Sequence, residues 1–431
     1  MSIQEGKRPF TFAGFVFLAS VFMVLTPQGR KYSFMESTFA WCFQVLMWNL
    51  LARSSNTIGI MLPHIFWRED CLVVHIKTTK SDKSGASYGK EKHVYANPLM
   101  PMICPMLSMG VMLLCRHRSD GKADCGKNDN ALFTGDSVDR FGTVLRKVLH
   151  DQVLVPETVD LGAVKADLGT HSNRKGAGTF LCGLSVAINA IAVFLRAGWS
   201  IGKVQSKYIM TGSAADQIVG RAVAGLPLHD SNFAVLPPHF TRKGLERLQD
   251  IGMNQIVPNF DKFPDGLQKA FPYLLASVIY HHDFLKGELS AQHPLWLQRL
   301  FTQPVTLNDG TEFDNAFTAL KGEKHLVTGV FKDREVGMKA SGLPPHLVLA
   351  CKLDTIAEQV SKLRESYEER SESNFEKIIW NCLLQKNESG KNMSGKTTLP
   401  LVLSFAKLSC EDVTRKIILK LPFVKSFSNH F

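Results

Sequence analysis

A long apolar segment at residues 33–62 limits the folds open to this chain. Within it, "FAWCFQVLMWNLLA" holds no charged side chain, and Arg-Ser-Ser-Asn follows at 53–56. The pattern predicts helix with an interruption at those four residues. A chain of 431 residues, 45% hydrophobic and 21% charged, is long enough for two or three domains with ordinary cores and is not disordered.

The order of the other segments predicts a mainly α fold with a small antiparallel β-hairpin, an α+β class. In residues 70–98, β-branched residues flank a turn rich in Lys, Ser, Asp and Gly, which indicates strand, turn, strand. Helical patterns occupy 99–115 and most of 138–208. The uncharged stretch 11–25 is short for a membrane span, so we expect a buried helix there and no membrane partner.

A second helical pattern lies near the carboxyl end. Apolar residues recur at alternating steps of four and three between residues 349 and 367. This spacing predicts a short coiled coil, although a helix packed on its own domain fits the pattern about as well. On the amino-terminal side of this pattern, the proline-containing segment 210–240 is a plausible domain boundary.

The net charge favours an anionic partner. The chain carries a formal charge of +11, and residues 1–240 hold most of the excess, with 25 Lys and Arg against 17 Asp and Glu. The nine cysteines are scattered and include no Cys-x-x-Cys pair, which fits a reducing compartment and neither a disulfide framework nor a zinc site. A P-loop-like run at 390–397 lacks the flanking strand and helix that nucleotide binding requires. We therefore expect no cofactor and no metal.

The stretch "DLGTHSNRKGAGTFLCG" (167–183) points to phosphate chemistry. His171 and Arg174 are three residues apart, so on a helix they share a face. They belong to a set of polar and aromatic residues that follow one another in a fixed order along the chain: Arg53, Lys80, His171, Arg174, Trp199 and Tyr208.

Each residue type suits the cleavage of a phosphodiester. Two guanidiniums hold the non-bridging oxygens and offset the charge of a pentavalent transition state. A lysine on a hairpin turn can protonate the leaving oxygen. A tyrosine can attack phosphorus if a base such as histidine activates it, and an indole N–H can donate to a phosphate oxygen.

This order resembles the catalytic domain of tyrosine recombinases, which break and rejoin DNA. The sequences "WNLLARSSN", "TTKSDKSG", "ANPLMPMICP", "HSNRKGAGTF" and "RAGWSIGKVQSKY" are similar to the Crypton transposon branch of that family. The resemblance implies a 3′-phosphotyrosyl intermediate formed without metal. By this resemblance, Arg53 is the first arginine, Lys80 the hairpin lysine and Tyr208 the nucleophile. His171 and Arg174 form the His-x-x-Arg box, and Trp199 takes the position usually held by a second histidine.

The resemblance also implies a domain order. It gives a leading helix in 1–35, a tyrosine recombinase-like catalytic domain in 36–240 and a C-terminal accessory region in 241–431. Many relatives carry an acidic residue where this chain has Asn56, and the family places a helical DNA-clamping domain ahead of the catalytic one. Here about 30 residues precede the motif region, so we expect either a truncated chain or a DNA grip supplied by 241–431.

The resemblance further implies double-stranded DNA as partner, self-association as a dimer or tetramer on DNA, and a nuclear location. The alternative is a non-catalytic DNA-binding protein derived from such a recombinase. Lys77 is a rival to Lys80 as the hairpin lysine, but it precedes the turn proper. Contacts to the DNA are expected from four lysines: Lys77, Lys83, Lys175 and Lys203. For Lys175 and Lys203, plain solvated charge is an equal alternative.

Overall fold

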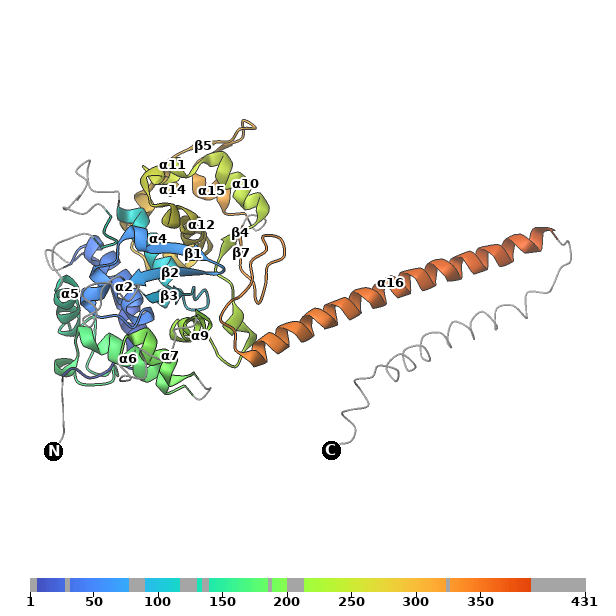
Figure 1. Cartoon of the computed structure of the whole chain (residues 1–431). Helices are drawn as coiled ribbons and strands as arrows, with labels where there is room; N and C mark the ends of the chain where they lie inside the picture. Colours follow the sequence, from blue (N-terminus) through green and yellow to red (C-terminus); the bar gives the residue numbers. More distant parts are fainter. Residues whose placement is uncertain are drawn as a thin grey trace, which may run out of the picture. The chain divides into compact units, whose positions relative to one another are not determined.

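The computed structural model describes most of the chain, in these ranges: 6–27, 32–76, 90–116, 130–133, 139–184, 188–199, 213–322 and 326–388. The chain divides into two compact units, Met1–Cys351 and Lys352–Phe431. The first unit is helix-rich and carries small antiparallel sheets, so the expected α+β class is confirmed (Figure 1).

Helix α2 (Phe34–Asn49) is the centre of the first unit, and every residue from Ser37 to Asn49 is buried. Its amino end is fixed by a capping box, in which the Ser33 hydroxyl accepts from the backbone N–H of Glu36 and the Glu36 carboxylate accepts from the backbone N–H of Ser33. The helix is interrupted as expected, but at 50–53 and not at 53–56: α2 stops at Asn49, and Ser54, Ser55 and Asn56 belong to a short helix, α3 (Ser54–Ile58).

Four helices pack around α2: α1 (Phe12–Val24), α4 (Pro105–Cys115), α5 (Arg140–Leu149) and α6 (Thr170–Cys182). Helix α1 is the buried helix expected from the stretch 11–25, and Phe15 on α1 stacks on Trp48 of α2 at a centroid distance of 4.2 Å. Among the residues that the structure describes, no helix is both long and apolar enough to cross a membrane.

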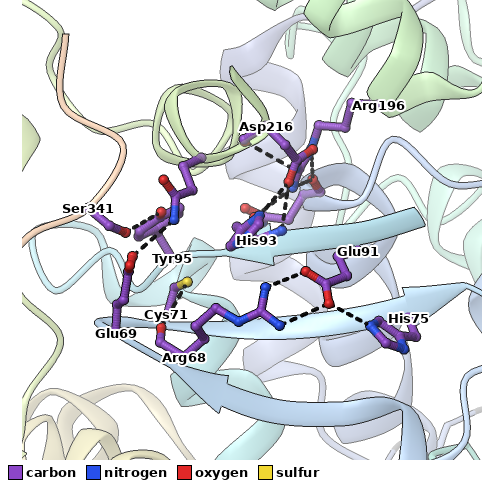
Figure 2. Close-up of polar contacts among 12 residues, drawn as sticks. Arg68, Glu69, Cys71, His75, Glu91, His93, Tyr95, Arg196, Asp216 and Ser341 are labelled. Carbon is purple, nitrogen blue, oxygen red and sulfur yellow. Dashed lines mark hydrogen bonds and ion pairs between the residues drawn. The ribbon is translucent and has the colours of Figure 1, made fainter. Parts of the chain in front are cut away.

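The expected hairpin is present as two strands of a three-stranded antiparallel sheet. Its strands are β1 (Ile65–Arg68), β2 (Cys71–Ile76) and β3 (Lys90–Val94), in that order. Val73 of β2 lies opposite His93 of β3, and His75 lies opposite Glu91. The Glu91 carboxylate binds the Arg68 guanidinium and the His75 ring, which joins all three strands across one face (Figure 2).

Helices α7 (Ala190–Ala197) and α9 (Ser213–Val223) complete the region around α6. Glycines on α6 permit close packing there. A Cβ on Gly176 would lie 2.5 Å from the backbone oxygen of Phe10 and 2.8 Å from the ring of Trp48. Only glycine allows this approach without displacing its neighbours, so α6 sits directly against α2 and the segment before α1.

Residues beyond 240 continue the first unit. They form α10 (Arg242–Ile251), α11 (Met253–Ile256), α12 (Asp265–Tyr280), α13 (His282–Glu288), α14 (Arg299–Thr302) and α15 (Ala316–Leu320), with the short pairs β4 (His239–Phe240) and β7 (Leu326–Val327), and β5 (Val305–Thr306) and β6 (Glu312–Phe313). Helix α12 packs on α4 and β1. The division between compact units therefore falls after Cys351 and does not coincide with the expected boundary near residue 240.

A buried ion pair joins three distant parts of the first unit. Arg221 on α9 pairs with Asp70, and both groups are fully buried. The Arg221 guanidinium also donates to the backbone oxygen of Ser341 at 2.5 Å, and the Ser341 hydroxyl donates to Asp70 at 2.6 Å. Because an unpaired buried charge is costly, these contacts hold the 341 region to the sheet and to α9.

The carboxyl-terminal helix α16 (Pro345–Glu388) is 44 residues long, or about 66 Å at 1.5 Å per residue. It contains the whole of the predicted seam 349–367, so the prediction of helix there is confirmed.

Candidate active site

Arg53 lies at the turn between α2 and α3. Leu51, two residues before it, has a φ of 47°, a left-handed conformation that is rare for a branched side chain. The chain is held in this turn because two cations bind the last carbonyls of α2. Lys92 of β3 donates to the backbone oxygen of Leu50 at 2.5 Å, and Arg196 of α7 donates to that of Asn49 at 2.8 Å.

Arg174 lies on the buried side of α6, with 6% of its surface exposed. Its guanidinium donates to the backbone oxygen of Ala197 at 2.5 Å. Burial, and next the neighbouring positive charge of Arg53, lower the pKa of Arg174 to about 10, so the group stays charged at neutral pH. The two arginines of the predicted set are therefore close enough for their charges to interact.

Trp199 joins this pair from the end of α7. Gly198, with a φ of 68°, ends the helix in the left-handed conformation, and Trp199 follows directly. The Arg174 guanidinium carbon lies 5.8 Å from the centre of the Trp199 ring. The ring rests on α6, because a Cβ on Gly178 would lie 2.8 Å from its edge.

His171 is exposed in the first turn of α6, on the same helical face as Arg174. Among the described residues, no hydrogen bond or ring contact joins its ring to Arg53, Arg174 or Trp199. Lys175 is exposed on the same helix.

The remaining predicted residues lie outside the described residues: Lys77, Lys80, Lys83, Lys203 and Tyr208. The elements on either side of their two segments are described. Residues 77–89 connect β2 to β3, and residues 200–212 connect Trp199 to the start of α9.

The two arginines carry positive charge that no described carboxylate pairs with. Among the described residues, neither Arg53 nor Arg174 forms an ion pair with Asp or Glu, and the first turn of α6 contains no acidic side chain. Two like charges held together in a partly desolvated place favour binding of an anion. In the same ranges, no group of three or more His, Cys, Asp or Glu side chains is arranged to hold a metal ion.

Comparison with known proteins finds likeness in structure and none in sequence. No protein-family model matches the chain, and no curated protein matches it in sequence. A solved structure described as "FLP Recombinase-Holliday Junction Complex I" aligns with 62% of this chain at 13% identity and a TM-score of 0.37. The alignment spans 62% of that chain's own length. Family and activity are therefore proposals, argued below from the residues of the site.

Sequence reasoning missed the network that supports the site. Asp216, in the first turn of α9, accepts from Arg196 at 2.6 Å and from the backbone and ring of His93 at 2.8 and 2.9 Å (Figure 2). Burial alone would raise the pKa of Asp216, but the charge of Arg196 and the hydrogen bonds of His93 lower it to about 2. We call Arg196, Asp216 and His93 the support cluster. It joins α7, α9 and β3 to the end of α2.

The sequence did contain a signal for this cluster. Arg196 stands in the apolar run "IAVFLRAG", where an unpaired guanidinium would be costly to bury, so it needs a buried partner.

Proposed function

We propose that this chain breaks and rejoins DNA through a covalent link between Tyr208 and a 3′-phosphate. The observation that supports the proposal is the charge interaction between Arg53 and Arg174, with Trp199 beside Arg174 and no ion pair from either arginine to a described carboxylate. A phosphodiester supplies the missing negative charge, and its two non-bridging oxygens suit two guanidiniums.

The proposed reaction is a transesterification. The Tyr208 oxygen attacks phosphorus, the phenolic proton passes to His171, and the bond from phosphorus to the 5′-oxygen breaks. Lys80 gives a proton to that oxygen, which leaves as a 5′-hydroxyl. The arginines offset the charge that grows on the phosphoryl oxygens. Rejoining is the same step in reverse with another 5′-hydroxyl, so neither an oxidant nor an energy source is needed.

Membership of the tyrosine recombinase family, its Crypton branch and a nuclear location are parts of this proposal. They are supported by the motifs of the sequence, by the contact of Arg174 with Trp199 and by the charge interaction of Arg174 with Arg53. The support cluster adds a physical reason, because it fixes both described ends of the segment that contains Tyr208: α7 leads to Trp199, and Asp216 lies at the start of α9.

The decisive experiment traps the covalent link. The full chain is incubated with a pool of nicked duplexes that carry random sequence around the nick. After cleavage, the short strand that ends at the nick diffuses away, so the covalent link cannot be reversed. We expect a denaturation-resistant protein–DNA adduct with the unsubstituted chain and with Tyr280→Phe, which removes a phenol from an exposed position. Tyr208→Phe should give none. An adduct with Tyr208→Phe would show that another residue is the nucleophile.

A second arm tests the arginine pair. Arg174→Lys keeps the charge but loses the planar fork that binds two oxygens, so we expect adduct formation to fall at least about 100-fold. DNA binding should persist and weaken steeply with salt. Arg146→Ala, at an exposed position of α5, should leave the adduct unchanged. If the unsubstituted chain binds DNA through Arg53 and Arg174 but never forms an adduct, the chain is instead a non-catalytic DNA-binding protein.

A further inference from the structure

Helix α16 carries a stripe of exposed apolar side chains. Six of them are between 54% and 68% exposed, and we call them the seam: Leu349, Leu353, Ile356, Val360, Leu363 and Tyr367. Elsewhere among the described residues, exposed large apolar side chains occur singly, as at Val153 and Leu297. Scattered exposed residues are ordinary, whereas a contiguous apolar stripe marks a surface that binds another protein.

The spacing of the seam fits a second helix of the same kind. Steps of four and three place Leu349, Ile356 and Leu363 at one core position of a heptad, and Leu353, Val360 and Tyr367 at the other. The next core positions would be Arg370 and Asn374, so the apolar pattern ends after Tyr367.

The charges beside the seam permit self-pairing. The positions that flank the core hold Ala350, Lys352, Ala357, Gln359 and Arg364. In a parallel, in-register pair, Lys352 faces Ala357 of the second copy and Gln359 faces Arg364, so no like charges oppose each other. Within the same helix, Arg364 also pairs with Glu368 four residues later at 2.7 Å.

The area of the seam is sufficient for a stable pair. Complete burial of a large aliphatic side chain removes on the order of 100 Å² from water. Six such side chains on each of two helices bury roughly 1,200 Å² in total, which reaches the lower end of stable protein–protein interfaces.

We propose that the chain forms a homodimer in which the α16 seams of two copies pack against each other. The dimer needs no DNA and does not depend on the activity proposed above. It would hold two copies of the arginine site in one molecule.

The test measures the mass of the full chain without DNA over a range of concentrations, by analytical ultracentrifugation. We expect a reversible dimer of the 48.0 kDa chain. Ile356→Lys with Val360→Lys places like charges in the seam and should weaken dimerisation at least tenfold. Thr355→Lys with Ser361→Lys adds the same charge one residue away, off the seam, and should leave the dimer intact.

An experiment that mixes two variants tests whether the partner of the seam is a second copy of the chain. Ile356→Glu with Val360→Glu should also be monomeric, and mixing it with the lysine variant should restore a dimer, because opposite charges then meet across the seam. Restoration is expected only if the seam binds a second copy. A monomer at all concentrations, equal loss in the off-seam control, or no restoration on mixing would overturn the proposal. So would loss of the dimer when residues 389–431 are deleted and the seam is intact.

Discussion

Replacing Asp216 with Asn removes the negative charge from the support cluster and tests the account of how the site is held. The carboxylate accepts from Arg196 and twice from His93, and its side chain is 14% exposed. In the variant, the fully buried Arg196 side chain keeps its charge but loses its counter-charge. Removing one partner of a buried ion pair is among the most destabilising substitutions, since the remaining charge stays desolvated.

The size of the effect follows from the pKa of Asp216. A pKa of about 2 in the folded chain, against 3.8 for the free group, corresponds to about 2.4 kcal/mol of stability at pH 7. Breaking a buried pair commonly costs 3–5 kcal/mol, so we expect about 3 kcal/mol. For a compact unit of 351 residues, the entropy of unfolding is roughly 0.7 kcal/mol per degree, which gives a fall in Tm of about 4 °C.

The assay is thermal unfolding at pH 7 and at pH 3. Because the folded pKa is depressed, the stability from ionised Asp216 is complete above pH 3.8 and is lost as the pH falls through 2, so about half remains at pH 3. The difference in Tm between Asp216→Asn and the unsubstituted chain should therefore be smaller at pH 3 than at pH 7. Glu91→Gln, in the half-exposed pair with Arg68, should shift Tm by about 1 °C or less. A Tm for Asp216→Asn equal to that of the unsubstituted chain at pH 7 would refute the reasoning.

Two further predictions concern buried histidines and a helix contact. Burial lowers the pKa of His281 and His293 to about 4, so each resists protonation in the folded chain, and each should remove about 2 kcal/mol of stability between pH 7.5 and pH 5. Chemical unfolding should show this slope, and replacing both residues with Gln should largely abolish it. Gly178→Ala forces the Trp199 ring to move and should cost about 1 kcal/mol as well as adduct yield. Gly287→Ala on α13, where no atom lies within 4 Å of the new Cβ, should stabilise by about 0.5 kcal/mol; an equal effect at both glycines would contradict the packing argument.

Local patterns predicted the elements of this fold well. The apolar segment 33–62, the hairpin at 70–98 and the stretch 11–25 each carry a strong signal of length and periodicity, and each forms the expected element. The pattern 349–367 likewise lies on a helix. The sequence did not indicate that residues 241–351 belong to the same compact unit, because the packing of α12 on α4 and β1 has no local signature.

Part of the site could be predicted because its chemistry depends on residue type and order. Arg53, Arg174 and Trp199 were chosen on those grounds. In the structure, Arg174 lies beside Trp199 and its charge interacts with that of Arg53. Asp216 could not be chosen in this way, because an acidic residue at a helix start is ordinary. Its role depends on Arg196 arriving from another helix. The contribution of Lys80 and Tyr208 stays a prediction.

The ion pair of Asp70 with Arg221 has a consequence for the order of folding during synthesis. Both groups are fully buried, and Ser341 contacts each of them. Its backbone N–H and hydroxyl donate to Asp70, and its backbone oxygen accepts from Arg221. When the ribosome has made residues up to 240, both charges exist but this cover does not, and about a hundred more residues must follow at roughly 5–20 per second. For several seconds, therefore, the nascent chain lacks the segment that shields these two groups from water. A fragment that ends at residue 240 would lack it altogether.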